Sequence, residues 1–439
     1  VRAAIREKYQ LLHYVSTALK AKLERALRVN MTEVEFVHLG TVWGTSEYTI
    51  ATEKIQASLS ATQAMVVWYP LEDETCVAIV RADKTIWKIL PVSQVRLARQ
   101  VSAISGNIKQ VSQEAGQQLR PFPVADAAAL YQALVAPLEE DLKGIDHIFT
   151  VQMGAVSNIP LGLLVTNSPD ASAPQWLVNR FAITRMPALL DVGILDKYRP
   201  QREGGSELLF AAGAPVIEGK TDVAARADIA EAARRTALGP LEDIPNASQM
   251  MENIAKTLGV SAKSMLVGRD MNKASVLEAL RKHTYKYLLF VTHGLVGGST
   301  VGEPALYLSP PAANNSEDDG LLRASEVVGL NLDTDLALLT ACKTSVAGDD
   351  GSEALAGLAS AFLVAGARNV LASHWEVDSA AAETISTKTV SLMHDNNMDP
   401  AKALQLVMQG MSKKMDLDSL EGHPYYWAAF EVIGFPYKK

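Results

Sequence analysis

The stretch Tyr287-Leu288-Leu289-Phe290-Val291-Thr292-His293-Gly294 decides how this chain folds. It opens with an unbroken apolar run, which is typical of a strand that is covered on both faces in a parallel sheet. Similar runs occupy residues 148–151, 208–211, 336–340 and 369–372, and helical patterns lie between them. This alternation predicts an α/β fold with a mainly parallel central sheet.

The N-terminal part of the chain shows another pattern. Residues 1–28 carry Ile and Leu at helical spacing among Lys, Arg and Glu, which predicts a long amphipathic helix. Residues 64–92 contain short β-rich runs separated by acidic turns, which predict an antiparallel meander, and a helix is expected over 92–118. We therefore predict two domains, 1–124 and 125–439.

Two helices and two loops are further predicted within the second domain. Helical spacing covers residues 126–142 and 247–258. Residues 213–226 and 310–320 are rich in Gly, Pro, Asn and Asp, which favours irregular loops open to cleavage.

The composition excludes several classes of protein. The chain has 439 residues, of which 48% are hydrophobic and 21% charged, and this balance is typical of a soluble globular protein. A formal net charge of -8 argues against a general electrostatic attraction to nucleic acid or to anionic lipid. No apolar run reaches the roughly eighteen residues of a membrane-spanning helix. We expect neither nucleic acid nor a membrane as a direct partner.

The N-terminus and the cysteines indicate the cellular compartment. The chain starts at Val1 without an apolar signal core, so we expect a cytoplasmic protein with further residues upstream. Its 2 cysteines, Cys76 and Cys342, cannot form a disulfide framework and lack zinc-ligand spacing. We therefore expect a reducing compartment, no bound metal and no other cofactor.

Two residues with catalytic chemistry follow directly after predicted strands, where sites form in open α/β sheets. His293 follows the first quoted run, and Cys342 follows the run at 336–340. Their separation, 342 minus 293, is 49 residues; in caspases the histidine precedes the cysteine by roughly 50. A thiolate is the attacking form of cysteine, and a neighbouring imidazole can take the thiol proton. We predict His293 as the base and Cys342 as the nucleophile, with backbone N–H groups near Gly294 and Cys342 stabilising the oxyanion.

A structural interpretation of each residue stays open beside the catalytic one. Free Cys is among the most often buried residues, and a single His after a strand usually has a structural role. Only the joint placement of His293 and Cys342 at two strand ends favours catalysis. We assign Cys76, which lies inside the predicted meander, to packing.

An ordered series of motifs covers the second predicted domain. It comprises residues 291–294, 305–309, 320–327, 339–344, 351–358, 362–370, 373–378 and 423–430. In this order the motifs resemble the CHAT domain, a caspase-like peptidase domain often found behind tetratricopeptide repeats and related to separase. The resemblance spans about residues 125–439, and it places the catalytic half at about 260–439.

The resemblance implies a caspase-like sandwich and a cysteine endopeptidase that cleaves a protein substrate. The His/Cys dyad of the family is carried over onto His293 and Cys342. An activating partner or an upstream repeat region is also implied, as is a role in bacterial defence. The sequence departs from the family pattern at Lys343, where an acidic residue is frequent, and at His374, where Leu is common. Neither departure removes a catalytic group.

Three acidic residues near the predicted site are candidates for substrate binding. Glu353, Glu376 and Asp378 fall in loops or at helix starts, where a carboxylate could pair with a basic substrate residue. Capping of a helix N-terminus and solvation are the more ordinary roles of such residues, and we favour them here. Residues 423–427 form an aromatic cluster that we interpret as a packing corner before a strand.

Two other functions stay open at this point. One is a catalytically silent scaffold of the same fold that binds a peptide or protein in the former substrate groove. The other is a thiol-dependent hydrolase that acts on small esters with the same nucleophile. Both differ from the peptidase in whether protein chains are cleaved.

Overall fold

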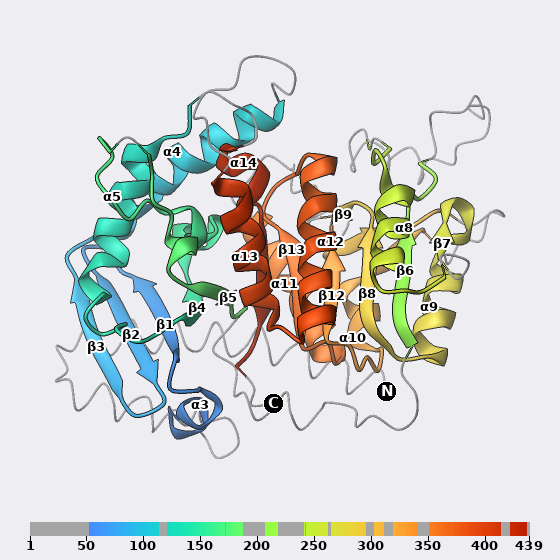
Figure 1. Ribbon diagram of the computed structural model, residues 1–439, viewed down its shortest axis with the longest axis horizontal. Helices are drawn as coiled ribbons and strands as arrows, with labels where there is room; N and C mark the ends of the chain where they lie inside the picture. The colour runs from blue at the N-terminus through green and yellow to red at the C-terminus, as the bar shows by residue number, and fades with distance from the viewer. Residues whose placement is uncertain are drawn as a thin grey trace. The chain divides into compact units, whose positions relative to one another are not determined.

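The structure is a computed structural model with two compact units (Figure 1). It describes residues 52–113, 121–171, 173–187, 207–217, 241, 243–261, 265–295, 303–310, 319–340, 351–413 and 422–436. The helix predicted over residues 1–28 lies outside these ranges. Unit 1 comprises Val1–Arg199, Met415–Pro424 and Ile433–Lys439, and unit 2 comprises Pro200–Lys414 and Tyr425–Val432.

Unit 1 contains the predicted antiparallel meander. Its strands are β1 (Gln63–Pro70), β2 (Thr75–Arg81) and β3 (Thr85–Leu90), and β2 pairs antiparallel with both neighbours. On its other side β1 pairs in parallel with β4 (His147–Gln152), which pairs in parallel with β5 (Ala182–Arg185). The meander is therefore part of a mixed sheet in the order β3-β2-β1-β4-β5.

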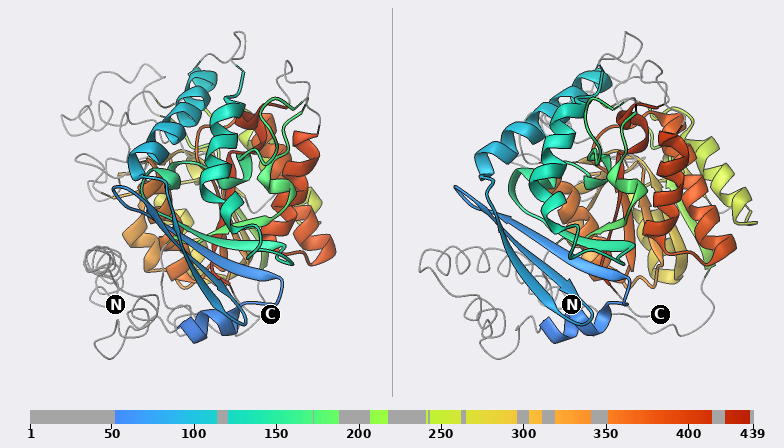
Figure 2. Two further views of the ribbon diagram at one scale, coloured as in Figure 1. Left: turned by 90° about the vertical axis from the view of Figure 1, so that its left-hand side faces the viewer. Right: turned by 60° about the vertical axis from the view of Figure 1, so that its left-hand side comes forward.

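The described helices of unit 1 begin with α3 (Thr52–Ser58) and α4 (Gln94–Gln113). α5 (Val124–Leu134) lies alongside α4 (Figure 2) and is shorter than the predicted helix 126–142. Pro137 explains the early end, because proline lacks the N–H that would continue the helix. The chain continues there as the 3-10 turn η1 (Ala136–Leu138).

Unit 2 is built on the predicted parallel sheet. Its strands run in the order β14-β13-β12-β8-β6-β7, of which Figure 1 labels β13 to β7, and β6, β8, β12 and β13 pair in parallel. The bounds are β6 (Glu207–Gly213), β7 (Leu266–Val267), β8 (Tyr285–Val291), β12 (Leu336–Leu339), β13 (Asn369–Ser373) and β14 (Phe430–Gly434). The predicted α/β class with a mainly parallel sheet is confirmed.

Helices flank this sheet. The longer ones are α8 (Ala247–Thr257), α9 (Lys273–Lys282), α11 (Gly351–Ala365), α12 (Ser379–Asn396) and α13 (Pro400–Ser412), and the short ones are α10 (Ala324–Val328) and α14 (Pro424–Trp427). Figure 1 shows α8, α12 and α13 side by side in front of the strands. Phe362 of α11 packs on Phe290 of β8, with ring centroids 5.7 Å apart. The sheet core is therefore apolar, as its unbroken hydrophobic runs predict.

A small antiparallel sheet in the order β11-β10-β9 lies next to the end of β8. Its strands are β9 (Gly294–Leu295), β10 (Ala305–Tyr307) and β11 (Leu321–Arg323). These strands contribute Leu295, Ala305, Tyr307 and Leu321 to a buried cluster that also holds Leu241. We did not predict this sheet, because strands of two or three residues are too short to show a period.

The compact units do not divide at the predicted boundary between residues 124 and 125. Unit 1 runs to Arg199, because β1 pairs in parallel with β4 and thereby draws β4 and β5 to the meander. The division at Arg199 describes how the chain packs into two compact units. The domain boundary between residues 124 and 125 stays a prediction.

Gly320 and Gly259 form a matched pair for a test of the small sheet. Both have positive φ, 69° and 66°, but a Cβ at Gly320 would lie 3.0 Å from the carbonyl oxygen of Leu308, whereas a Cβ at Gly259 would meet nothing within 4 Å. We expect Gly259→Ala to lower the free energy of unfolding by about 1–2 kcal/mol. Gly320→Ala should lower it by about 1–3 kcal/mol more, because the backbone at Leu308 and Pro310, directly after β10, must shift. Urea denaturation measures both, and equal losses would contradict the crowding at Gly320.

Candidate active site

His293 lies directly after β8 and is buried, with 6% of its surface exposed. Its backbone is held by β10, since the N–H of Tyr307 donates to the carbonyl of His293 at 2.8 Å. The hydroxyl of the preceding Thr292 also donates a hydrogen bond to the carbonyl of Tyr307. The backbone at the end of β8 is therefore fixed by the small sheet as well as by its neighbours in the large one.

β12 runs parallel to β8, and the two strands end at the same edge of the sheet. The two strands pair in parallel, with Leu339 opposite Phe290. Thr340 continues the pairing, because its N–H and its hydroxyl both donate to the carbonyl of Phe290, at 3.1 and 3.2 Å. Cys342 and Lys343 lie outside the described residues, so the predicted dyad is described on its histidine side alone.

β6 completes this edge of the sheet. Gly213, its last residue, lies opposite Val291, and a Cβ on it would be 2.9 Å from the Cβ of Val291. The next residue, Ala214, donates its N–H to the carbonyl of Val291 at 3.2 Å. The hydroxyl of Ser309 then accepts from the N–H of Val216 at 2.8 Å. The chain after β6 is therefore anchored to the segment that follows β10.

The other predicted site residues lie on or beside separate elements of unit 2. Gly294 begins β9 and lies opposite Leu306, so it follows His293 into the small sheet. Glu376 is exposed beyond the end of β13. Asp378 is the N-cap of α12, and its carboxylate accepts the N–H groups of Ala380 and Ala381, both at 3.0 Å.

Glu353 belongs to α11, and its side chain lies outside the described part of the chain. Of the three acidic candidates, only Asp378 has a described structural role, which is the helix cap that the sequence left open beside substrate binding. The substrate-binding roles of all three stay predictions.

His374, a departure from the family pattern, forms a buried hydrogen-bonded contact with a carboxyl group. Its Nε2 lies 2.8 Å from Oε2 of Glu431, and the two side chains are 2% and 4% exposed. The sequence singled out His374 but not Glu431, because the partner lies on β14, 57 residues away. Next to it, the indole N–H of Trp375 donates to the carbonyl of Tyr425 at 3.0 Å. The aromatic corner predicted at 423–427 is thus a packing element in this structure.

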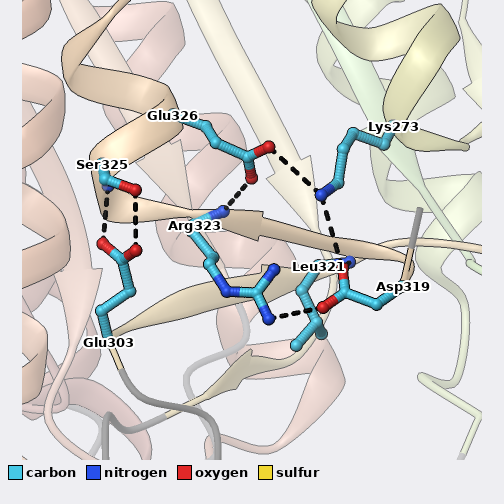
Figure 3. A network of polar contacts seen from close by, with 7 residues as sticks. All are labelled: Lys273, Glu303, Asp319, Leu321, Arg323, Ser325 and Glu326. Atoms are coloured by element: carbon cyan, nitrogen blue, oxygen red, sulfur yellow. Dashed lines mark hydrogen bonds and ion pairs between the residues drawn. The ribbon is translucent and has the colours of Figure 1, made fainter. Parts of the chain in front are cut away.

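A charged network surrounds β11 and was missed by the sequence analysis (Figure 3). Lys273 lies 3.4 Å from Asp319 and 3.2 Å from Glu326, and Arg323 pairs with Asp319. Glu303 accepts two hydrogen bonds from Ser325, one from its backbone N–H and one from its hydroxyl. No single motif contains these residues, so only the tertiary structure reveals the network.

Metal binding and membrane insertion find no support in the part of the chain that the structure describes. Within those residues no three His, Cys, Asp or Glu side chains gather closely enough to ligate an ion. No helix there combines the length and the apolar character needed to cross a bilayer.

Comparison with known families identifies the fold family. A family model described as the CHAT domain matches residues 124–435, most of the chain. The chain belongs to the CHAT domain family. The resemblance inferred from the ordered motifs is therefore confirmed, and with it the assignment of the chain to a family of caspase-like cysteine peptidases at the level of the fold.

Two curated relatives resemble the CHAT domain described here. The human tetratricopeptide repeat protein 28 is 25% identical over 342 residues, which cover 70% of this chain and 13% of the relative. The mouse protein of the same name is 24% identical over 340 residues, with the same shares. The chain thus spans about an eighth of the length of these relatives.

Two solved structures overlap with the chain at low identity. The separase of the Saccharomyces cerevisiae separase–securin complex is 12% identical, with a TM-score of 0.47 over 88% of this chain and 31% of that one. The Arg-specific cysteine proteinase gingipain R is 11% identical, with a TM-score of 0.40 over 76% of this chain and 74% of that one. The strand order described above, rather than this overlap, defines the fold of the chain.

Replacement of His374 by the family's usual Leu tests the buried His374–Glu431 contact. We expect His374→Leu to lower the free energy of unfolding by about 1–3 kcal/mol, because the buried Oε2 of Glu431 would lose its hydrogen-bond partner. The double variant His374→Leu with Glu431→Leu should recover most of that loss. Chemical denaturation measures both, and a single variant as stable as the native chain would contradict the pairing.

Proposed function

We propose that this chain is a cysteine endopeptidase that cleaves a protein substrate, with His293 as the base and Cys342 as the nucleophile. The observation that carries the proposal is the register of β8 and β12. Phe290 lies opposite Leu339 in this parallel pair. Three residues further along the sequence from Phe290 comes His293 (290 plus 3), and three residues further from Leu339 comes Cys342 (339 plus 3). Membership of the CHAT domain family supports the same pair.

The chemistry follows from the proton that the two side chains share. The imidazole of His293 accepts the proton of the Cys342 thiol, and the thiolate attacks the carbonyl carbon of the scissile peptide bond. The imidazolium then returns the proton to the leaving amine, and a thioester remains on Cys342. Water, activated by the same imidazole, hydrolyses the thioester. Backbone N–H groups at Gly294 and Cys342 are proposed to stabilise the oxyanion in both steps.

The acidic side chains at this edge of the sheet fit a substrate that carries a basic residue near the cleaved bond. Glu376 is exposed beyond β13, the strand next to β12, and its carboxylate is available to a cationic side chain. Asp378 is committed to two backbone N–H groups of α12 and therefore contributes mainly its charge. We propose Glu376, Asp378 and Glu353 as substrate contacts.

Control by a region outside this chain is the second part of the proposal. The curated relatives are named for tetratricopeptide repeats, and the matched part is 13% of their length. We therefore propose that a repeat region or a protein partner activates the peptidase. A cytoplasmic location and a role in bacterial defence stay predictions from the family resemblance.

Alkylation by iodoacetamide tests the dyad without a known substrate, because the two cysteines are expected to react differently. Cys76 is buried, and burial, together with the charge of Glu74, raises the pKa of its thiol to about 11. It serves as an unreactive internal control at neutral pH. We expect Cys342 to be labelled quickly at pH 7. The variant His293→Ala should react about tenfold or more slowly, since the thiol pKa returns toward its ordinary value of roughly 8.5. Mass spectrometry of the labelled peptides measures both rates.

Equal labelling rates of Cys342 in the native chain and in His293→Ala would contradict the dyad. The unchanged resistance of Cys76 verifies that unit 1 stays folded, and thermal melting of the variant verifies unit 2, to which His293 and Cys342 belong.

Cleavage of a protein is tested by comparing new N-termini in cells that express the longer natural protein or its Cys342→Ala variant. We expect new termini that depend on Cys342, with basic residues enriched before the cleaved bonds. Abolition of these termini by His293→Ala is also expected. The absence of Cys342-dependent termini, with the activating region present, would favour the silent scaffold. Turnover of small esters without such termini would favour the hydrolase.

A further inference from the structure

The side chains around β11 form one continuous set of ion pairs and hydrogen bonds (Figure 3). Asp319 lies at its centre, because its carboxylate contacts Lys273 at 3.4 Å and Arg323 through a hydrogen-bonded ion pair. The same carboxylate accepts the N–H of Leu321 at 3.1 Å. Lys273 is only 11% exposed and also contacts Glu326 at 3.2 Å. The network therefore links the start of α9 to both ends of β11.

The far end of β11 is fixed in the same manner. Glu326 accepts the N–H of Arg323 at 2.9 Å in a capping box at the start of α10. Glu303 accepts the N–H and the hydroxyl of Ser325 at 2.8 and 2.7 Å. Glu303 precedes β10, so this contact also holds the start of that strand. β11 and the start of β10 are thus both anchored by charged side chains.

Backbone hydrogen bonds connect this anchored region to His293. β11 pairs antiparallel with β10, and the N–H of Leu308 donates to the carbonyl of Gly320 at 2.7 Å. Tyr307, in the middle of this path, donates its N–H to the carbonyl of His293 at 2.8 Å and accepts the hydroxyl of Thr292. Any shift of β11 would therefore be passed to the backbone that carries the imidazole.

We infer that Asp319 and Lys273 are positioning residues for His293, which hold the small sheet in the place that the proposed dyad requires. This inference rests on the proposed function. Interactions between charged groups fix orientation more strictly than apolar contacts, because hydrogen bonds to carboxylates are directional. A displacement of about 1 Å in a catalytic group can reduce a rate by about a hundredfold. Loss of one carboxylate charge in this network should therefore change the reactivity of Cys342 more than it changes stability.

Asp319 and Arg323 keep their charges while the dyad titrates. Burial would raise the pKa of the Asp319 carboxyl, but the hydrogen bond and charge of Arg323, the charge of Lys273 and the Leu321 N–H together hold it below its ordinary value. The hydrogen bond from Asp319 holds the pKa of Arg323 above its ordinary value. Both groups stay ionised from about pH 5 to 9. The stability that Asp319 contributes is lost only as pH falls through its lowered pKa. A change in Cys342 labelling within this range therefore does not arise from titration of Asp319 or Arg323.

The experiment measures the rate of iodoacetamide labelling of Cys342 against pH in variants of the network. Asp319→Asn keeps an oxygen for the Leu321 N–H but removes the charge, and Lys273→Met removes the ammonium group. We expect both to slow labelling at pH 7 by about tenfold and to move its pH midpoint toward that of His293→Ala. Lys273→Arg keeps the charge and should retain a midpoint near that of the native chain.

Glu140→Gln provides the matched control. It removes an exposed ion pair with Lys143, 2.6 Å long, in unit 1, so it should leave the midpoint unchanged. Thermal melting of each variant, together with the resistance of Cys76, verifies that the chain is folded at the assay temperature. If Asp319→Asn fails this check, Lys273→Met decides, because it leaves the Asp319–Arg323 pair intact.

The outcomes of this experiment distinguish a failure of the positioning role from a failure of the proposed dyad. A native midpoint in Asp319→Asn and Lys273→Met, with a shifted midpoint in His293→Ala, would overturn the positioning role and leave the dyad intact. Lower melting temperatures with an unchanged midpoint would do the same, because the network would then be purely structural. Identical midpoints in the native chain and in His293→Ala would overturn the proposed function itself.

Discussion

The parallel hydrogen-bonded register of β8 and β12 is the constraint on which the rest of the site depends. It sets Leu339 opposite Phe290, and Thr340 extends it with two hydrogen bonds to the Phe290 carbonyl. A slip of one residue in such a pair would turn every side chain to the other face of the sheet. Because both strands are apolar and buried on both faces, the register is specified by packing along its whole length. The same register also fixes Thr340, the residue directly after β12.

The residue after each strand of a parallel sheet no longer takes part in the interstrand backbone hydrogen bonds. A second element therefore has to fix its position. For His293 that element is β10, whose Tyr307 donates its N–H to the His293 carbonyl and accepts the hydroxyl of Thr292 at its own carbonyl. Gly320 contributes on the opposite side, since its left-handed backbone and missing Cβ let it approach the Leu308 carbonyl. The small sheet thus supplies the support that the large sheet does not provide at its edge.

The large elements could be predicted from the sequence because each carries its own pattern. Unbroken apolar runs predicted β8, β12 and β13 to within about two residues, and the family motifs singled out His293. The small sheet could not be predicted, since its strands are too short for a period. Nor could its charged network, whose contacts join Lys273 to residues 46 and 53 positions away. The pairing of β1 with β4, and the partner of His374, depend on tertiary structure in the same way.

Charged side chains at such a place require a reason other than stability. Bringing Lys273 and its carboxylate partners out of water has a desolvation cost that their attraction only partly offsets, so an apolar substitute could stabilise the fold equally well. What an apolar substitute lacks is direction: Asp319 contacts an ammonium, a guanidinium and a backbone N–H at once, and only one arrangement of β11 satisfies all three. A single fixed arrangement matters most where a displaced side chain would lower the reactivity of a catalytic group. β11 is connected through β10 to β9, and β9 begins immediately after His293. The network is therefore best understood as a device that fixes geometry.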